Sequence, residues 1–234
     1  MNTVVFIVPC FNASKNIQNI IDSLLAQKNE NWICIFADDI STDNTWDVLQ
    51  EVEKTDKRIF ISKNETKFFA LRNIVEKARM YQGAEVIIAV IDGDDSLCNE
   101  DAVDILIKEY KAGHDVVWTA HRWDINGMNI SKEMPQNVDP YAWPWSSSHL
   151  RTFKSTLLEK ISDENFKDTK GNWFERGYDQ ALMLPLLSVS NSRKFVNEVC
   201  YLYNINSVSI ADRSWEERKQ ISTINLVRSR GFLK

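Results

Sequence analysis

The sequence predicts a single α/β domain in which a mostly parallel central sheet is flanked by helices. Three observations support this prediction. Strand-like and helix-like segments alternate over residues 1–120, the strands are short, continuous apolar runs, and two of them end in carboxylates. With 234 residues, of which 44% are hydrophobic, the chain is large enough to build one such core.

The first two strands and the helix between them have clear local signals. Val4–Val8 is an apolar, largely β-branched run that stops at Pro9, and proline has no N–H to donate to a sheet. Ser14 can cap a helix that continues to about Gln27, because apolar residues follow at helical spacing. Trp32–Ala37 is again apolar and is expected to form the second strand.

The alternation continues through residue 120. A second helix is expected after Thr42, and the strand that ends at Ile91 is the most apolar one. The other predicted segments are the strand Arg58–Ser62, the helix Phe69–Met80, the strand Glu85–Ile91, the helix Asp101–Tyr110 and the strand Asp115–Thr119.

Beyond residue 120 the pattern is less regular, and residues 121–150 are loop-like. The segments expected to be regular are helices around Lys154–Ile161 and Asp179–Val189, a strand or hairpin at Phe195–Tyr203, and a helix at Trp215–Arg228 capped by Ser214. The last helix is amphipathic and could pack on the chain's own sheet or on a second subunit. A homodimer is therefore an alternative to packing within one chain.

Charge and hydropathy disfavour several classes of protein. The net charge is −5, from 28 Lys and Arg against 33 Asp and Glu, whereas proteins that grip a nucleic-acid backbone usually carry a basic face. The N-terminal segment lacks the basic region of a signal peptide, and no apolar run approaches the ~20 residues that span a bilayer. We therefore expect a cytoplasmic protein without a transmembrane segment, in the host cytoplasm if the chain is viral.

The strongest chemical signal is the run Asp92-Gly93-Asp94-Asp95, which directly follows a predicted strand. Three carboxylates within four residues repel one another unless a cation lies among them. Hard oxygen ligands suit Mg²⁺ or Mn²⁺, and Gly93 lets a ligand approach the backbone closely. The alternative is a solvated turn that caps the next helix. The placement at a strand end favours a metal or nucleotide site.

A second acidic pair, Asp38 and Asp39, also ends a predicted strand. A carboxylate there could accept a hydrogen bond from a pyrimidine N–H or from a ribose hydroxyl, while the following Ser41–Asp43 is better suited to cap a helix. Early in the third helix, Arg72 could neutralise a diphosphate or could be an ordinary surface residue.

Together these motifs resemble a known family. The segments Val8–Asn12, Asp38–Asp43, Ala70–Asn73 and Asp92–Asp95 occur in the order and approximate spacing of the family 2 glycosyltransferases. The resemblance implies the GT-A fold, a Rossmann-like sheet, and inverting transfer from a nucleotide sugar. It also implies that residues 1–120 bind the nucleotide sugar and that residues 121–234 bind the acceptor and add a C-terminal helix.

The resemblance assigns roles residue by residue. Phe11 matches the aromatic residue that stacks on the base, Asp38 or Asp39 would contact the base, and Arg72 would lie near the pyrophosphate. The expected donor-binding set is Pro9, Phe11, Asn12, Asp38, Asp39, Arg72, Asp92, Gly93 and Asp94. The expected metal ligands are Asp94 or Asp95 together with Asn206, which occupies the position of a family histidine.

The resemblance places the catalytic base at Asp179, in a segment where the family usually has a Glu-Asp pair and this chain has Tyr178 before the aspartate. An inverting mechanism needs one base within reach of the attacking hydroxyl. The alternative is that Asp179 caps the following helix, with Asp168 and Glu175 as reserve bases.

The acceptor side is less specific. Candidate acceptor residues are Trp143, Trp145, His149, Arg151, Trp173 and Tyr178, although the large aromatic residues could equally cover the sheet. The implied donor is a UDP sugar, and the acceptor is a glycan or another hydroxyl, with a modified DNA base less favoured. Two alternatives are a nucleotidyltransferase-like enzyme, disfavoured by the lack of a Gly-rich phosphate loop near Val8–Asn12, and a non-catalytic sugar- or nucleotide-binding relative.

Overall fold

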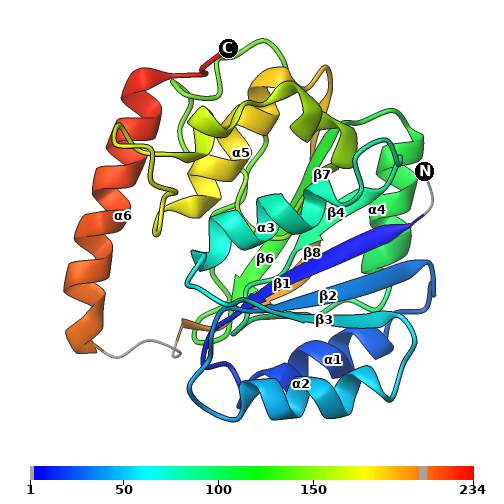
Figure 1. The fold of residues 1–234 in the computed structure, drawn as a ribbon. Coiled ribbons are helices and arrows are strands. Elements are labelled where there is room, and N and C mark those ends of the chain that lie inside the picture. The colour runs from blue at the N-terminus through cyan, green and yellow to red at the C-terminus, as the bar shows by residue number, and fades with distance from the viewer. Residues whose placement is uncertain (1–2, 206–209) are drawn as a thin grey trace.

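A computed structural model describes residues 3–205 and 210–234, with the side chains of residues 210–214 left undescribed. These residues form one sheet of eight strands in the order β3-β2-β1-β4-β7-β6-β8-β5, with helices on both faces (Figure 1). Strands from the beginning and the end of the chain share this sheet, so the prediction of a single α/β domain is confirmed.

The first half follows the predicted alternation. Its elements are β1 (Val4–Cys10), α1 (Ile17–Leu25), β2 (Trp32–Asp38), α2 (Thr45–Glu53), β3 (Ile59–Lys63), α3 (Phe69–Arg79) and β4 (Ile87–Val90). Strand β1 pairs in parallel with β2 and β4, and β2 pairs in parallel with β3. All four strands therefore end at the same edge of the sheet.

The second half adds strands to the other side of β4. Its elements are β5 (Ser96–Leu97), α4 (Ala102–Lys111), β6 (Val116–Trp123), β7 (Arg151–Lys154), the 3₁₀ helices η1 (Ser155–Lys160) and η2 (Asp163–Phe166), α5 (Tyr178–Val189), β8 (Arg193–Tyr203) and α6 (Ile210–Arg230). Strand β7 is antiparallel to both β4 and β6, and β8 is parallel to β6.

The structure differs from the sequence prediction most clearly at β7, β5 and α6. The segment predicted as a helix at Lys154–Ile161 begins as the end of strand β7 and continues as a 3₁₀ helix rather than an α-helix. This strand is only four residues long, so its partners β4 and β6 decide its conformation rather than its own propensity. The two-residue strand β5 is likewise set by pairing with β8, and α6 begins at Ile210 rather than at Trp215.

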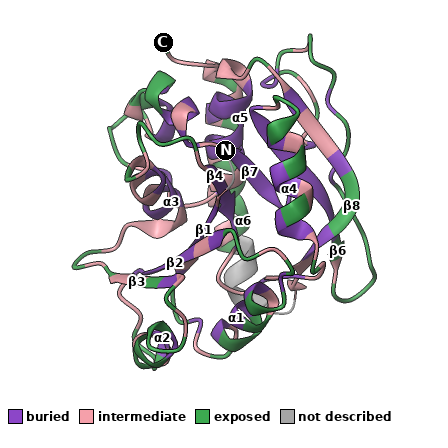
Figure 2. Cartoon of the chain, turned by 90° about the vertical axis from the view of Figure 1, so that its right-hand side faces the viewer, coloured by how far each residue is buried: buried purple, intermediate pink, exposed green. Residues whose placement is uncertain are grey.

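The sheet is buried on both faces, as its apolar strands require. Alternate residues of β1 enter different clusters: Phe6 packs with residues of α1, α2 and α4, whereas Ile7 packs with residues of α3, α5 and η1. Figure 2 shows the strands largely buried and the outer faces of α1, α2 and α4 exposed. The two faces of the sheet therefore each have their own core.

The C-terminal helix α6 lies along one side of the molecule, beside α5 (Figure 1). It packs within its own chain, because Val227 is buried in the same core as residues of α3 and α5. Trp215 and Ile221 are exposed on it. Among residues 3–205 and 210–234, no helix is both long and apolar enough to cross a membrane.

Candidate functional site

The carboxyl ends of β1, β2 and β4 bring three of the predicted motifs together. The amide of Asp39 donates to the carbonyl of Cys10 at 2.8 Å, and the amide of Ile91 donates to that of Ile7 at 3.1 Å. Gly93 lies so close to β1 that a Cβ atom there would be 2.8 Å from the carbonyl oxygen of Pro9. Only glycine fits at this position without a shift, which explains its place among the aspartates.

A cavity of about 210 Å³ opens at this edge of the sheet. It is lined by Pro9, Cys10, Phe11, Asp39, Lys67, Phe69, Ala70, Asn73 and Arg176. Phe11 is a large aromatic residue that is nevertheless 51% exposed; Lys67 Nζ covers one face of its ring, so a flat ligand would stack on the other face. Its neighbours place a carboxylate, an amide and two cations around that ring.

Asp39 organises one wall of this cavity. Its carboxylate accepts hydrogen bonds from the amides of Phe68 and Phe69 at 2.7 and 2.8 Å and from Asn64 Nδ2 at 2.8 Å, and Lys67 Nζ lies 3.4 Å away. Burial alone would raise the pKa of Asp39, but these hydrogen bonds and the charge of Lys67 outweigh it and lower the pKa. Asp39 therefore remains ionised and fixes the loop that leads into α3.

Two other residues that were predicted to bind the nucleotide sugar shape the neighbouring loops. Asn12 has a left-handed φ of 51°, and its side-chain oxygen accepts from the amide of Thr42 at 2.8 Å. Asp38 is completely buried and accepts from the amide of Ser41 at 3.3 Å. The Asn12 bond holds the loops after β1 and β2 against each other, and the Asp38 bond closes the turn after β2.

Arg72 does not line the cavity. Its Nε donates to Glu76 at 2.7 Å and its guanidinium stacks 3.6 Å over the ring of Phe68. The cations that do line the cavity are Lys67 and Arg176, which are not among the predicted site residues. The position of Arg176, three residues before Asp179, was the only available signal for it.

The acidic run after β4 is held by a tyrosine from β8. The buried hydroxyl of Tyr201 donates to Asp95 Oδ2 at 2.9 Å and accepts from the amide of Asp92 at 2.9 Å, while the amide of Asn204 donates to Asp95 Oδ1 at 2.7 Å. Burial, followed by the charges of Asp92 and Asp94, raises the pKa of Asp95 well above its ordinary value. A cation at this position would relieve that repulsion.

The geometry supports one group of possible metal ligands in the described part of the chain. Single oxygen or nitrogen atoms of Asp92, Asp95 and His149 all lie within 4.8 Å of one another. His149 was predicted on the acceptor side, and the structure instead places it beside the aspartates. The predicted ligand Asn206 lies outside the described residues, and Asp94 is partly buried next to the group.

His149 is fixed by aromatic neighbours. Its ring stacks on Tyr201 with centroids 4.6 Å apart and an interplanar angle of 12°, and His121 lies edge-on at 5.5 Å. Burial, with a smaller effect of the Arg151 charge, lowers the pKa of His149 well below its ordinary value. The imidazole is therefore neutral, which is the form that binds metals.

A buried arginine connects the acidic run to Tyr178 at the start of α5. Arg151 is 2% exposed and its Nη2 donates to Asp92 Oδ1 at 2.7 Å and to the Tyr178 hydroxyl at 3.0 Å. The Tyr178 hydroxyl in turn donates to the same oxygen of Asp92. Both residues were predicted on the acceptor side, whereas the described contacts tie them to the acidic run.

Asp179 follows Tyr178 in the first turn of α5, which begins after Gly177 in a left-handed conformation. Burial raises the pKa of Asp179, and the nearby charge of Arg151 opposes this only in part. A carboxylate with a raised pKa is a stronger base once ionised. The structure thus places Asp179 close to the acidic run.

The three predicted tryptophans lie in different surroundings. Trp143 and Trp145 pack against the core that contains α3 and α5, as expected of aromatic residues that cover a sheet. Trp173 stacks on Phe166 with centroids 5.9 Å apart and also lines a second cavity of about 340 Å³. That cavity lies between residues 168–176 and α6, and Arg176 lines both cavities.

Comparison with known proteins agrees with this architecture. The model of the family described as glycosyl transferase family 2 matches residues 5–183. TuaG of Bacillus subtilis (strain 168), named as a teichuronic acid biosynthesis glycosyltransferase, is 38% identical over 222 residues, which cover 92% of this chain and 83% of TuaG. Chondroitin synthase of Escherichia coli is 28% identical over 207 residues, covering 83% of this chain and 28% of the synthase.

Solved structures show the same fold at low sequence identity. The crystal structure of S. aureus TarS residues 1–349 in complex with UDP-GlcNAc superposes with a TM-score of 0.72 at 17% identity, covering 99% of this chain and 68% of that one. The mannosyltransferase PcManGT from Pyrobaculum calidifontis, in complex with GDP-Man and Mn²⁺, gives a TM-score of 0.61 at 14% identity, covering 94% and 63%. The predicted GT-A type of α/β fold is confirmed.

Proposed function

Because this chain belongs to glycosyl transferase family 2 and is a glycosyltransferase, we propose that it transfers a sugar from a UDP sugar to a hydroxyl of a glycan, with inversion at the anomeric carbon and with a divalent metal. The observation that carries this proposal is the adjacency of two features. The 210 Å³ cavity, with Phe11 and Asp39, opens at the same strand ends as the acidic run Asp92–Asp95.

The donor proposal follows from the cavity lining. Phe11 offers a ring for the base, and Asp39, whose carboxylate is held by the amides of Phe68 and Phe69, lines the same cavity. The TarS structures were solved with UDP-GlcNAc and with UDP, which supports a uridine nucleotide here. Lys67 and Arg176 provide positive charge at the same cavity, as a nucleoside diphosphate requires.

A divalent cation fits the residues present. His149 Nδ1 is buried without a hydrogen-bond partner in the described part of the chain and lies 3.9 Å from Asp92 Oδ2, and the acid Asp95 is crowded by like charges. Asp92, Asp95 and His149 would hold the ion, with Asp94 as a further candidate. Bound there, Mn²⁺ or Mg²⁺ would stabilise negative charge on the departing diphosphate.

In this proposal Asp179 is the general base. Its carboxylate accepts the proton of the attacking acceptor hydroxyl, the hydroxyl oxygen bonds to the anomeric carbon, and the nucleoside diphosphate leaves with the electrons of its bond to the sugar. Burial raises the pKa of Asp179 and so strengthens the base. Arg151 compensates the charge of Asp92 and keeps two acidic groups close to each other.

The acceptor proposal rests on the second cavity and on the relatives. The 340 Å³ cavity combines the ring of Trp173 with polar side chains such as Asn172 and Ser222, a combination suited to a sugar. The names of TuaG and of chondroitin synthase both refer to polysaccharides. A glycan acceptor in this cavity is therefore the favoured proposal.

The proposal is tested by a thermal-shift screen of UDP, GDP, dTDP, CMP and their common sugar conjugates, each with and without Mn²⁺. A ligand at about 100 times its Kd should stabilise the protein by about 2.7 kcal/mol, which corresponds to roughly 5–10 °C in a chain of this size. We expect UDP to raise Tm only when Mn²⁺ is present. A shift by no nucleotide under either condition would contradict the donor site.

A further inference from the structure

Two cationic side chains and one carboxylate line the donor cavity. Its charged lining residues are Asp39, Lys67 and Arg176. The carboxylate of Asp39 already accepts from two backbone amides and from Asn64. Burial lowers the pKa of Lys67, and the charge of Arg176 lowers it further against the opposing effect of Asp39. Two cations from distant parts of the sequence thus face one small cavity, which favours an anionic ligand.

Lys67 is already held at one side of this cavity. Its Nζ lies 2.9 Å from the centroid of the Phe11 ring, 3.4 Å from Asp39 Oδ2 and 3.1 Å from the Asp39 carbonyl oxygen. It therefore already lies over one face of the Phe11 ring, at the wall of the cavity.

Arg176, the second cation of the cavity, is held by the C-terminal helix. Its Nη2 donates to the carboxylate of Glu216 in α6, and its Nη1 donates to the carbonyl oxygen of Glu175 at 3.3 Å. Helix α6 also touches the next residue, because a Cβ atom on Gly177 would lie 3.1 Å from the carbonyl oxygen of Gln220. Helix α6 thus pairs with the guanidinium of Arg176 and packs closely against the adjacent Gly177.

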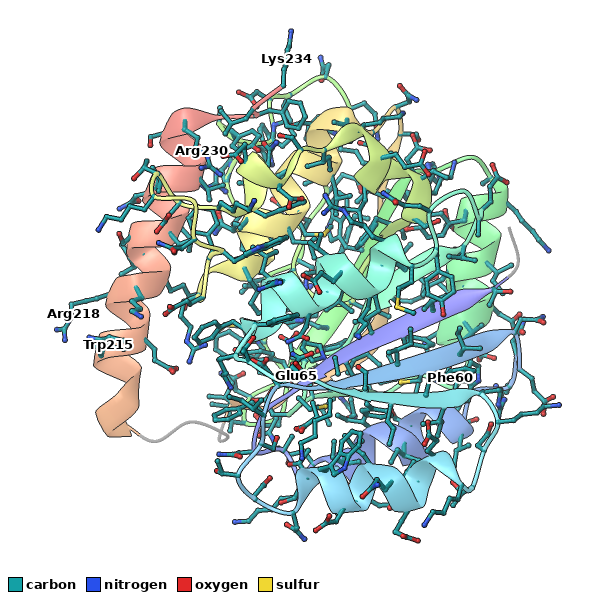
Figure 3. The ribbon with its side chains drawn as sticks, viewed as in Figure 1. Phe60, Glu65, Trp215, Arg218, Arg230 and Lys234 are labelled. Carbon is teal, nitrogen blue, oxygen red and sulfur yellow. The ribbon has the colours of Figure 1, made fainter. Side chains whose placement is uncertain are left out.

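The orientation of α6 separates these contacts from its outer surface. Arg218 points away from the body of the molecule in Figure 3, whereas Glu216 and Lys219 pair with Arg176 and Glu175 on the inner side. This helix lies beyond residue 183, where the family match ends. Membership of the family therefore assigns no role to Glu216.

We propose that Arg176 and Lys67 together bind the diphosphate of the donor nucleotide, and that Glu216 is a positioning residue that holds the Arg176 guanidinium at the cavity. This rests on the nucleotide-sugar donor proposed above. A guanidinium held on its outer edge loses little side-chain freedom when its remaining N–H groups bind phosphate oxygens. The C-terminal helix would then contribute to donor affinity without touching the donor.

The test compares nucleotides that differ only in phosphate. Isothermal titration of the full chain, in the presence of Mn²⁺, measures Kd for UDP against uridine and for GDP against guanosine. Arg176→Gln should weaken binding of the diphosphate about tenfold or more, as expected for loss of a charge-assisted hydrogen bond, and leave nucleoside binding within about twofold. Arg176→Lys keeps the charge and should recover part of the loss.

Glu216 has a matched control on the same helix. Lys219→Ala removes the neighbouring ion pair between α6 and residue 175, but that pair does not reach the donor cavity. Glu216→Ala should weaken the diphosphate about threefold and leave the nucleoside unchanged, whereas Lys219→Ala should change neither. Glu216→Asp retains a carboxylate and should lie between the wild type and Glu216→Ala.

Each contrary result has its own meaning. Equal loss of UDP and uridine binding in Arg176→Gln would overturn the diphosphate contact. Tighter UDP binding in Glu216→Ala, or the same effect from Lys219→Ala, would overturn the positioning role. Binding by the wild type that none of the variants alters would overturn this inference alone, whereas a wild type that binds no nucleotide would overturn the proposed donor site with it.

Discussion

The hydroxyl of Tyr178 donates a hydrogen bond to Oδ1 of Asp92, although the two residues lie 86 positions apart. This contact ties the helix that carries Asp179 to the acidic run after β4. A tyrosine here donates a hydrogen bond to the aspartate, whereas the glutamate that the family resemblance leads one to expect would add a second negative charge. The change at residue 178 therefore has a clear electrostatic reason.

Removal of this hydroxyl should cost stability and function together. We expect Tyr178→Phe to lower the free energy of unfolding by about 2 kcal/mol, because the bond is made to a charged group, and to reduce sugar transfer. Urea unfolding and a transfer assay measure the two effects. Tyr110→Phe is the control, since Tyr110 bonds to the neutral Thr152 at 2.8 Å; it should cost about 1 kcal/mol and leave transfer unchanged. Equal effects on transfer would contradict the role of Tyr178.

Arg151 should be far more costly to remove than an arginine in a partly exposed pair. Arg151→Met leaves Asp92 without its buried counter-charge and should destabilise the fold by about 3–5 kcal/mol. Arg79→Met breaks an ion pair with Asp163. The side chains of Arg79 and Asp163 are 26% and 37% exposed, so this variant should lower the free energy of unfolding by no more than about 1 kcal/mol. Adding Asp92→Asn to Arg151→Met should restore part of the loss. A double variant less stable than the single one would show that the charge of Asp92 is not what Arg151 compensates.

Asp179→Asn should separate catalysis from stability. We expect it to abolish transfer while nucleotide binding persists. Because burial raises the pKa of Asp179, the ionised side chain destabilises the fold at neutral pH. The variant should therefore unfold at a higher Tm than the wild type at pH 7, and the gap should close as pH falls through the raised pKa. Normal turnover by Asp179→Asn would remove the base assignment.

Asp39 should show the opposite dependence on pH. Its pKa is lowered in the folded state, so the ionised side chain contributes stability above the unfolded pKa, and this stability is lost as pH falls through the folded pKa. Asp39→Asn should cost about 2–4 kcal/mol at pH 7, because one carboxylate satisfies several N–H groups. Urea unfolding measured from pH 7 downward should show this cost shrinking in acid. A cost that does not change with pH would contradict the ionic role.

The two neighbouring histidines should differ in metal binding. His149→Gln should weaken Mn²⁺ binding at least about tenfold, because it removes one member of the ligand group. His121→Gln, 5.5 Å away but outside that group, should bind Mn²⁺ like the wild type. Electron paramagnetic resonance of free Mn²⁺ measures both without any turnover. Equal affinity in the two variants would assign the ion to the aspartates without His149.

Much of the fold could be predicted because its signals are local. An apolar β-branched run becomes a buried strand wherever it lies, so the strands of the first half begin and end within a few residues of their predicted positions. The acidic runs were recognisable as site residues because parallel strands end at one edge of the sheet. Strand β7 was not predicted, since four residues carry too little pattern to indicate a strand.

The sequence by itself determined the α/β class, the family and the placement of the acidic runs at strand ends, because these depend on short-range patterns and on motif order. The tertiary structure decided which side chains complete the site. Tyr201 reaches Asp95 across 106 positions and Arg151 reaches Asp92 across 59. Such partners are set by strand pairing. Neither residue type nor spacing predicts them, because a buried polar contact is formed only when two distant segments share a core.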